Sequence, residues 1–513
     1  MAPGIADGIL FTDQYQLTMA QLYFRRDMHE QPAQFDYFYR TNPDYGRHQA
    51  GYGVTVGLDG LLDWMGDARF GPDELDRLRL RTSSGGERLF AEDFLEWLAI
   101  NGDFGGIELD AVPEGRIVHP HLPIVVARGP LAMAQILESS LLNQLNYPSL
   151  VATKASRIAE SASGPVLEFG MRRGPGRGAN AGARAALIGG CDFTSNVGIS
   201  HEVGVDPQGT HAHSMVQAFM ALGLGELEAF RAFAEVYPDN CILLVDTVDT
   251  LGSGIPNAIT VFEALRDAGH DPAGVRLDSG DLAYLAVQAA RRLDDAGFAD
   301  VPIVLSGDLD ELAIWQILSQ IDDEAPRYGL DPDEVKRRLV YGVGTRLITS
   351  HGHGALDGVY KLVAMEEKGA WVPSIKVSET PAKVPIPGPN SVWRLYDERG
   401  IATVDVIAAA DEHPLADEEI TLHHPYLDGV TRTVRRSEIS QAESLLEPAW
   451  RRGARVGPTP VIDELRARRR ADLDRLDIGV RRLVNPHVYH VSLTSRLKQL
   501  QHDLVAAAHE SVG

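Results

Sequence analysis

The sequence predicts an α/β protein in which an irregular (β/α) barrel is joined to a second α/β domain. Three observations lead to this prediction. From about residue 165, short apolar runs alternate with helical segments, and polar residues gather directly after each run. The runs are apolar throughout, which is typical of parallel strands buried on both faces. About eight such units within roughly 200 residues favour a closed barrel, with a doubly wound open sheet as the alternative.

The length and composition support this reading and exclude several classes of function. A chain of 513 residues is long enough for two or three domains. Acidic residues outnumber basic ones by 72 to 48, and the resulting net charge of -24 repels nucleic acids and anionic membranes. The two cysteines, Cys191 and Cys241, exclude a disulfide scaffold and a four-cysteine zinc site.

No stretch of about 18 apolar residues predicts a membrane span. The N-terminal residues lack the basic segment and apolar core of a secretory signal. We therefore expect a cytoplasmic protein that binds neither membranes nor nucleic acids.

The first 130 residues or so predict mixed α and β structure. Thr12 or Asp13 is a suitable cap for a helix that follows it. Residues 33–40 form an aromatic run typical of a strand. Residues 131–161 carry apolar side chains at helical spacing, and Pro148 interrupts the pattern.

The barrel strands are predicted from the apolar runs that follow. They are PVLEFG at 165, ALIGG at 186, a weak run near 203, ILLVD at 242, GVRLD at 274, PIVLS at 302, LVYGVG at 339 and VYKLV at 359. Helices are predicted between most of them, for example at 214–236, 257–268 and 281–296. The charged segment 322–338 predicts a surface excursion. The tail from about 430 is arginine-rich and predicts solvated helices.

Polar residues after the predicted strands are the main indication of a catalytic site. In a barrel these positions converge on the C-terminal mouth, where active sites lie. The residues are Arg172, Arg173, 194–196, 210–213, 246–249, 278–281, 306–308, Gly344 and Thr345.

The motif GTHAHS places two histidines, His211 and His213, at the mouth. Their spacing of i and i+2 is not the i and i+4 spacing by which a helical pair of histidines chelates one metal. A histidine at a barrel mouth can act as an acid, a base or a nucleophile that accepts a phosphoryl group. The alternative is an ordinary core or surface histidine.

The motif GVRLDSGDL brings an arginine and two aspartates out of one strand end. Arg276 can hold a carboxylate with both arms of its guanidinium. Asp278 can accept hydrogen bonds from ribose hydroxyls or bind Mg²⁺. The alternative is an internal Arg–Asp pair with Asp281 as a helix cap.

Two glycine-rich segments suit anionic ligands. GVGT at 342–345 follows an apolar strand, and its backbone N–H groups can cradle a phosphate. EFGMRRGPGRGANAG at 168–182 carries three arginines among glycines and predicts a mobile cationic loop. Ordinary surface turns are the alternative for both.

Together, these motifs resemble the nicotinate phosphoribosyltransferase family. The resemblance runs in order over about 450 residues. It includes TDQYQLTMAQLYF, FDYFYR, LLNQLNYPSLVATKASRI, EFGMRRG, GGCDFTSNVG, GTHAHS, LLVDTVDTL, GVRLDSGDLAYL, GVGTRLITS, GVYKLV, IKVSE and PHVYHVSLT. Met215 stands where the family often has an aromatic residue. The segment 322–338 and the alanine-rich end 503–513 also depart from the pattern.

The resemblance implies the type II phosphoribosyltransferase fold. An N-terminal α/β domain is expected at 1–148, an irregular barrel at 149–378 and a C-terminal segment returning to the first domain at 379–513. The implied reaction converts nicotinate, 5-phosphoribosyl 1-diphosphate, ATP and water to nicotinate mononucleotide, diphosphate, ADP and phosphate. Mg²⁺ and a homodimer with a composite active site are implied as well.

The resemblance also assigns roles to residues. His213 is the histidine that ATP phosphorylates, while Tyr15, Thr210 and Arg276 surround nicotinate and Thr345 contacts the phosphate of the phosphoribosyl group. The other expected substrate-binding residues are Arg172, Asp278, Ser306 and Gly344. Either Asp278 or Asp281 is a candidate for Mg²⁺.

Two other functions remain open at this stage. Nicotinamide phosphoribosyltransferases resemble this chain but carry an aspartate in the loop that corresponds to DFTSN. Here Thr194 and Ser195 occupy that loop and the nearest acid is Asp192, which favours a carboxylate substrate over an amide. A non-catalytic phosphosugar-binding barrel would lack the nucleophile or the anion-binding residues, and the sequence retains both.

Overall fold

The computed structural model describes residue 4 and residues 6–510, so the end of the alanine-rich segment 503–513 lies outside the described residues. The chain forms two compact units. Unit 1 contains the residues up to Leu150 and those from Ala355 onward, and unit 2 contains Val151–Gly354. Among the described residues, no helix is long and apolar enough to cross a membrane.

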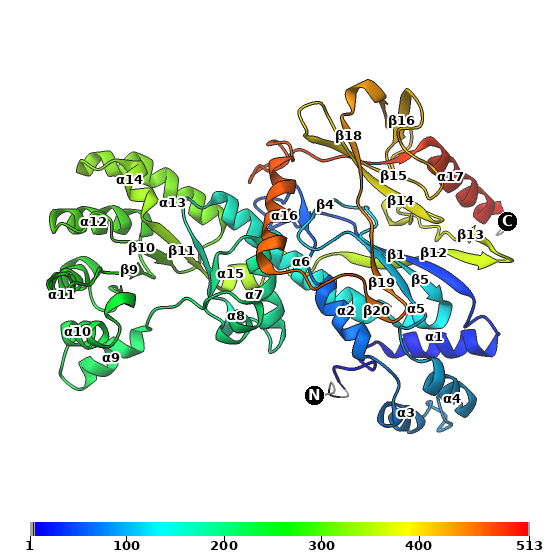
Figure 1. Ribbon diagram of the computed structural model, residues 1–513, viewed down its shortest axis with the longest axis horizontal. Helices are drawn as coiled ribbons and strands as arrows, with labels where there is room; N and C mark the ends of the chain where they lie inside the picture. The colour runs from blue at the N-terminus through cyan, green and yellow to red at the C-terminus, as the bar shows by residue number, and fades with distance from the viewer. Residues whose placement is uncertain (1–3, 5, 511–513) are drawn as a thin grey trace. The chain divides into compact units, whose positions relative to one another are not determined.

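A seven-stranded sheet forms the centre of unit 1 (Figure 1). In order across the sheet the strands are β13 (Ala370–Pro373), β12 (Gly358–Glu367), β1 (Pro32–Tyr39), β5 (Val125–Pro130), β3 (Glu108–Ala111), β19 (Glu447–Arg451) and β20 (Ala454–Arg455). The run VYKLV at 359 belongs to β12 and pairs antiparallel with β1, so its prediction as a barrel strand is wrong. Unit 2 accordingly ends before the expected barrel boundary at 378.

A second sheet lies in the C-terminal part of unit 1. Its strands are β17 (Thr431–Arg435), β16 (Glu419–His423), β21 (Val491–Thr494), β15 (Ala402–Ala409), β14 (Asn390–Tyr396) and β18 (Gln441–Ser444). The short strands β2 (Gly53–Val54) and β4 (Ile117–Val118) form a separate pair. The tail from about 430 begins with strands, but the predicted arginine-rich helix ELRARRRADLDRL is confirmed at Ile462–Asp474.

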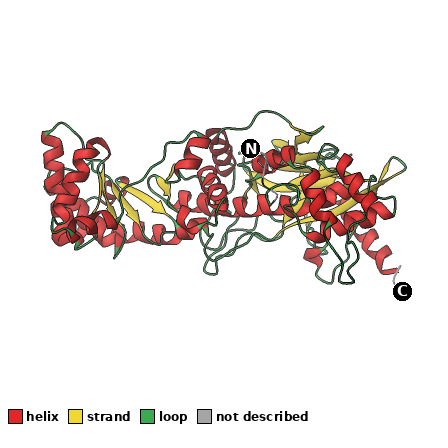
Figure 2. Cartoon of the chain, turned by 90° about the horizontal axis from the view of Figure 1, so that it is seen from below, coloured by secondary structure: helices red, strands yellow, loops and turns green. Residues whose placement is uncertain are grey.

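Helices cover the sheets of unit 1 (Figure 2). They are α1 (Gln14–Arg25), α2 (Leu58–Asp67), α3 (Pro72–Arg79), α4 (Glu92–Asn101), α5 (Leu131–Ile136), α6 (Glu138–Ser161), α16 (Ile462–Asp474) and α17 (Ser495–Glu510). The predicted helix after Thr12 is confirmed, with Asp13 at its N-cap position. Pro148 lies inside α6 and does not end it.

Six parallel strands form the sheet of unit 2. In order they are β7 (Phe193–Thr194), β6 (Val166–Glu168), β11 (Leu339–Val343), β10 (Ile303–Ser306), β9 (Gly274–Leu277) and β8 (Ile242–Leu244). The first strand of unit 2 in sequence order is β6, and it pairs with the last, β11, as in a barrel. Within the described residues the edge strands β7 and β8 do not pair with each other, so the ladder is not a closed ring.

Nine helices are described in unit 2, several of them around the outside of β9 to β11 (Figure 1). They are α7 (Gly178–Gly189), α8 (Val197–Val203), α9 (His213–Ala221), α10 (Glu226–Val236), α11 (Ile255–Asp267), α12 (Leu282–Asp295), α13 (Glu311–Glu324), α14 (Pro332–Arg337) and α15 (Thr345–Ile348).

Two predicted strands of unit 2 are helical instead. The run ALIGG at 186 ends α7, and the weak run near 203 ends α8. A Cβ added at Gly189 would lie 2.5 Å from the backbone oxygen of Ala152, so α7 and α6 approach closely there. Small apolar residues serve this helix contact, which the apolar run alone does not distinguish from a strand.

The charged segment 322–338 is also more ordered than expected. It contains the end of α13 and all of α14, and the side chains of Ala325 and Val335 are buried. The segment is part of unit 2 and its other side chains are exposed or half-buried, so the predicted surface excursion contains regular helix.

Candidate active site

The strand ends of unit 2 bring polar side chains together at one edge of the sheet. Because β8, β9, β10 and β11 are parallel neighbours, their carboxyl ends lie side by side. Asp246 follows β8, Asp278 follows β9, Ser306 ends β10 and Gly344 follows β11.

Arg276 is the centre of this group. Its Nε donates to the Ser306 hydroxyl at 2.8 Å, its Nη1 to the Thr210 hydroxyl at 3.0 Å and its Nη2 to Asp278 Oδ1 at 2.7 Å. The three contacts come from different segments and fix the guanidinium plane. A guanidinium has five N–H donors, so these bonds leave two for a ligand.

Asp278 is held as a carboxylate by its neighbours. Burial by itself raises the pKa of Asp278, but hydrogen bonds from Ser306 and the charge of Arg276 outweigh it, so the pKa is below its usual value. The backbone N–H of Asp278 donates to Asp246 Oδ2 at 3.0 Å. The Arg–Asp pair that the sequence left as an alternative is therefore present, within the same group as the other polar residues.

His213 is the first residue of α9, not the end of a strand as the sequence predicted. Its Nδ1 lies 3.0 Å from the Thr247 hydroxyl. Its Nε2 faces two carboxylates, with Asp246 Oδ1 at 3.8 Å and Asp278 Oδ2 at 4.0 Å. The ring is 38% exposed, so Nε2 is accessible to a ligand.

Asp246 belongs to the residues 246–249 that the sequence places at the mouth, but the sequence assigned it no role of its own. Its Oδ2 accepts hydrogen bonds from the Asp278 N–H and the Ser279 hydroxyl. Its Oδ1 is buried and has no hydrogen-bond partner among the described residues, although it lies near His213. A buried carboxylate oxygen without a partner is costly unless a ligand or cation satisfies it. Its position at the end of the run ILLVD is the signal in the sequence that points to it.

His211 differs from His213 in environment. Its ring is buried, and burial lowers its pKa to about 4. Its Nε2 accepts the backbone N–H of Leu244 at 3.1 Å, which requires a neutral ring. Of the two histidines, His213 is therefore the one placed to meet a ligand.

Thr210 lines an apolar cavity of about 230 Å³, whose other walls include residues of β6, β8, β10 and β11. Phe169, which follows β6, lines it, and the Arg276 guanidinium lies 5.5 Å from the centroid of its ring. Phe169 was not singled out from the sequence, although it lies within the EFGMRRG motif. An aromatic wall beside an arginine suits a flat ring that bears a carboxylate.

The EFGMRRG segment is anchored by a buried glutamate. Glu168 accepts hydrogen bonds from the Gly170 N–H and the Thr194 hydroxyl. Burial raises its pKa above the usual value, although these bonds partly oppose the effect. Arg172 follows in a short 3₁₀ turn and its side chain is exposed.

The remaining candidates of unit 2 lie at the start of helices. Gly344 precedes α15, and Thr345 is its exposed first residue. Asp281 is the N-cap of α12 and accepts the Tyr284 N–H, and both of its oxygens accept from Gln320 Nε2. The carboxylate of Asp281 is therefore already occupied by structural contacts.

Tyr15 belongs to unit 1, on α1, and its side chain is half exposed. Burial of part of the ring and the charges of Glu138 and Asp13 raise its pKa. Lys361 lies 3.9 Å from Glu138, and burial together with the charges of Arg40 and Lys376 lowers the pKa of this lysine. Glu138 is therefore close to both Tyr15 and Lys361.

The described residues contain no group of three His, Cys, Asp or Glu side chains arranged to hold a metal ion by themselves. The unpaired Oδ1 of Asp246 and the carboxylate of Asp278 are nevertheless oxygen donors of the kind that Mg²⁺ prefers. Residues near His213 therefore fit a Mg²⁺ ion that takes its other ligands from substrate and water.

Family models match two segments of this chain, and similar proteins match most of its length. A model of the nicotinate phosphoribosyltransferase N-terminal domain matches residues 10–146, and one of the C-terminal domain matches 390–501. A Bacillus subtilis protein named nicotinate phosphoribosyltransferase is 38% identical over 94% of this chain and 92% of its own length. A Caenorhabditis elegans protein of the same name is 31% identical over 96% of this chain and 93% of its own.

Solved structures show the same similarity. The crystal structure of human nicotinic acid phosphoribosyltransferase matches with a TM-score of 0.78 and 29% identity, covering 96% of this chain and 99% of that one. A nicotinate-nucleotide pyrophosphorylase from Pyrococcus furiosus shares the fold, with a TM-score of 0.64 at 22% identity over 93% of this chain and 97% of that one. Its relatives match over nearly the whole chain, and its motifs occur in the order typical of them. This chain belongs to the nicotinate phosphoribosyltransferase family.

Proposed function

We propose that this protein transfers the phosphoribosyl group of 5-phosphoribosyl 1-diphosphate to the ring nitrogen of nicotinate. The products are nicotinate mononucleotide and diphosphate, and ATP is hydrolysed to ADP and phosphate in the same cycle. The observation that carries the proposal is Arg276, whose guanidinium is fixed beside His213 with two N–H donors left for a carboxylate. Membership of the family supports the same activity.

In this proposal nicotinate lies against the ring of Phe169, with its carboxylate at Arg276. The two remaining N–H donors of Arg276 bind its carboxylate, and the face of Phe169 packs on the pyridine ring. Thr210 orients the guanidinium through the hydrogen bond that it accepts. Nicotinamide lacks the negative charge that this arrangement selects, and the relatives' names favour the acid as well.

Phosphoribosyl transfer needs positioning more than covalent catalysis. The bond between C1 of the ribose and diphosphate breaks, positive charge builds on the ribose, and the pyridine nitrogen attacks C1. The protein has to hold both reactants in line and stabilise the departing charge. Thr345, Gly344 and Arg172 are proposed to bind the phosphates, and Asp278 and Ser306 to contact the ribose.

His213 is proposed to accept the γ-phosphoryl group of ATP. With Nδ1–H directed at the Thr247 hydroxyl, the lone pair of Nε2 is free to attack phosphorus. A P–N bond forms, ADP leaves, and water later releases phosphate from the histidine. Asp246 and Asp278 face Nε2 and stabilise the ring as it becomes positive.

Asp246 and Asp278 are also the residues proposed to hold Mg²⁺ together with substrate phosphates. A divalent cation there supplies charge screening for the phosphate groups. Asp281 is a weaker candidate, because its carboxylate caps α12 and binds Gln320.

We further propose that the active site is composite and that the protein is a homodimer, with Tyr15 supplied by the second subunit. Tyr15 is half exposed on a helix of unit 1, which suits a ring that stacks on nicotinate from outside. Arg40 and Lys376 lie close enough to Lys361 to lower its pKa, and this group of cations suits substrate phosphates. In this proposal the sheet of unit 2 is the irregular barrel of the type II fold, open between β7 and β8.

A product assay tests the proposal. Purified protein is incubated with 5-phosphoribosyl 1-diphosphate, Mg²⁺ and ATP, and with equal amounts of nicotinate, nicotinamide and quinolinate as competing acceptors. Nicotinate mononucleotide is expected as the main nucleotide, together with ADP. A dominant nicotinamide nucleotide would refute the assignment of the acid, and no nucleotide at all would refute the activity.

A further inference from the structure

The loop that precedes His213 connects the two open edges of the parallel sheet in unit 2. At one edge, the Gln208 N–H donates to the backbone oxygen of Thr194 in β7 at 3.0 Å. At the other edge, Nε2 of His211 accepts the backbone N–H of Leu244 in β8 at 3.1 Å. β7 and β8 do not pair with each other in the described part of the chain. Residues 208–211 lie between these two edge strands and form a hydrogen bond with each of them.

The direction of the Leu244 N–H explains why an acceptor is needed there. In a strand, successive backbone N–H groups point to opposite sides. The next N–H, that of Val245, donates to the backbone oxygen of Arg276 on the β9 side at 3.1 Å. The Leu244 N–H therefore points away from β9, toward the open edge, where no strand carbonyl is available. The ring nitrogen of His211 replaces that carbonyl.

The surroundings of His211 keep this nitrogen available as an acceptor. The side chain is 9% exposed and lies edge-on to the Phe233 ring, with centroids 5.0 Å apart. Burial, together with the nearby charges of Arg276 and His213, lowers the pKa of His211 to about 4. The ring is thus neutral at ordinary pH, and Nε2 keeps its lone pair.

We infer that His211 is a positioning residue that holds His213 in its reacting orientation. The segment 211–213 is attached at two points, through His211 to Leu244 at the end of β8 and through His213 to Thr247 just after it. The first attachment lies two residues before His213 and fixes the backbone on which His213 sits. This inference rests on the proposed phosphorylation of His213.

The test uses two replacements of His211 and one control. His211→Leu fills much of the space without an acceptor, whereas His211→Gln restores an acceptor oxygen. His201→Leu is the control, because His201 is exposed on the neighbouring helix α8. For each protein, the incorporation of γ-phosphate from ATP is compared with the ATP-independent transfer to nicotinate, and thermal unfolding shows whether the variant is folded.

We expect His211→Leu to slow phosphate incorporation by roughly 10- to 100-fold, because small misplacements of reacting groups have effects of this size. The factor by which its ATP-independent transfer falls should be at least ten times smaller than the factor for phosphate incorporation, because that transfer does not use the His213 imidazole. His211→Gln should recover most of the phosphate incorporation, and the His201→Leu control should match the wild type.

Several results would overturn the inference. They are phosphate incorporation at the wild-type rate in His211→Leu, an equal fall of both activities, and a His211→Gln protein as slow as His211→Leu. If the wild-type protein itself incorporates no phosphate, the proposed function fails first and the inference falls with it.

A second measurement does not depend on the leucine variant being folded. As the pH falls toward 4, protonation of His211 removes its acceptor in the wild type, whereas an amide oxygen in His211→Gln remains. The rate of phosphate incorporation in the wild type, relative to His211→Gln, should therefore fall in this range. His213 and Arg276, which face His211, are the same in both proteins. Identical pH profiles would contradict the positioning role.

Discussion

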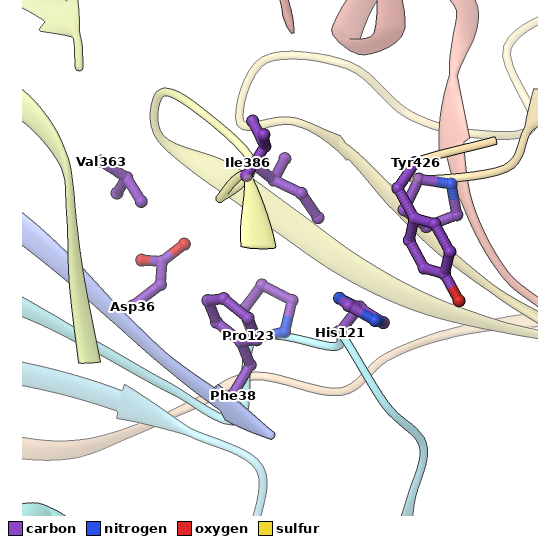
Figure 3. Close-up of a pocket in the computed structure, with 9 residues that line it drawn as sticks. Asp36, Phe38, His121, Pro123, Val363, Ile386 and Tyr426 are labelled. Carbon is purple, nitrogen blue, oxygen red and sulfur yellow. The ribbon is translucent and has the colours of Figure 1, made fainter. Parts of the chain in front are cut away.

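Replacement of Asp36 by asparagine is expected to stabilise unit 1 at neutral and alkaline pH. Asp36 lies in the middle of β1, is 2% exposed and accepts a hydrogen bond from Gln34 Nε2 at 3.0 Å. With Phe38 and His121 it lines a cavity of about 10 Å³, no larger than one water molecule (Figure 3). An asparagine has nearly the same shape, keeps an acceptor for Gln34 and cannot ionise.

The size of the effect follows from the pKa of this carboxyl. Burial raises the pKa of Asp36 from 3.8 to about 7, although Gln34 and the charge of Arg128 partly oppose the shift. Between these values the folded chain holds a proton that the unfolded chain has lost, so the free energy of unfolding falls as the pH rises through about 4 to 7. At about 1.4 kcal/mol per pKa unit, the full cost above pH 7 is on the order of 4 kcal/mol. Asp36→Asn removes this cost.

Urea denaturation followed by tryptophan fluorescence measures this difference. Of the six tryptophans only Trp315 lies in unit 2, so the signal reports mainly on unit 1. The advantage of Asp36→Asn over the wild type should grow between pH 5 and pH 8, and the exposed Asp67→Asn should show no such growth. An advantage that does not change with pH, or a loss of stability at pH 8, would refute the reasoning.

Three further predictions concern the active site. His213→Ala should abolish stimulation by ATP and γ-phosphate incorporation while a slow ATP-independent transfer survives; phosphate uptake at the wild-type level would exclude His213. Arg276→Lys keeps the charge but loses the planar fork, so the preference for nicotinate over nicotinamide should fall by about 30- to 1000-fold, or on the order of 2 to 4 kcal/mol; an unchanged preference in competition assays would exclude this role. Mixing inactive Tyr15→Ala and Arg276→Ala proteins should restore roughly a quarter of the wild-type activity, since about half of randomly assembled dimers are mixed and each has one intact site. No recovery after verified subunit exchange would place Tyr15 outside a shared site.

The sequence predicts strands well where apolar runs end in a polar motif. GVRLDSGDL gives β9 and places Arg276 and Asp278 correctly at its end. It fails where the same apolar pattern serves another contact, as in α7, whose small residues pack on α6. It cannot choose the pairing partner of a strand, so VYKLV was assigned to the barrel although β12 pairs with β1.

Single residues of the site show the same limit. Asp246 matters because its unpaired Oδ1 faces His213 from another segment, and a linear pattern contains no such information. Phe169 is likewise recognised only when the ring is seen beside Arg276. The role proposed for His211 depends on the N–H of Leu244, which no neighbouring strand of the described sheet accepts and which donates to the His211 ring.

The insertion of unit 2 into unit 1 has a consequence for the order in which the chain is made. β1 needs β12 on one side, yet β12 begins at Gly358, after the whole of unit 2. At about 5 to 20 residues per second, the ribosome needs roughly 15 to 60 seconds to span those intervening residues. During that time one edge of β1 is unpaired, and an exposed apolar strand edge invites pairing with other chains. Slow synthesis or high temperature should therefore increase aggregation during translation more than it affects the finished protein.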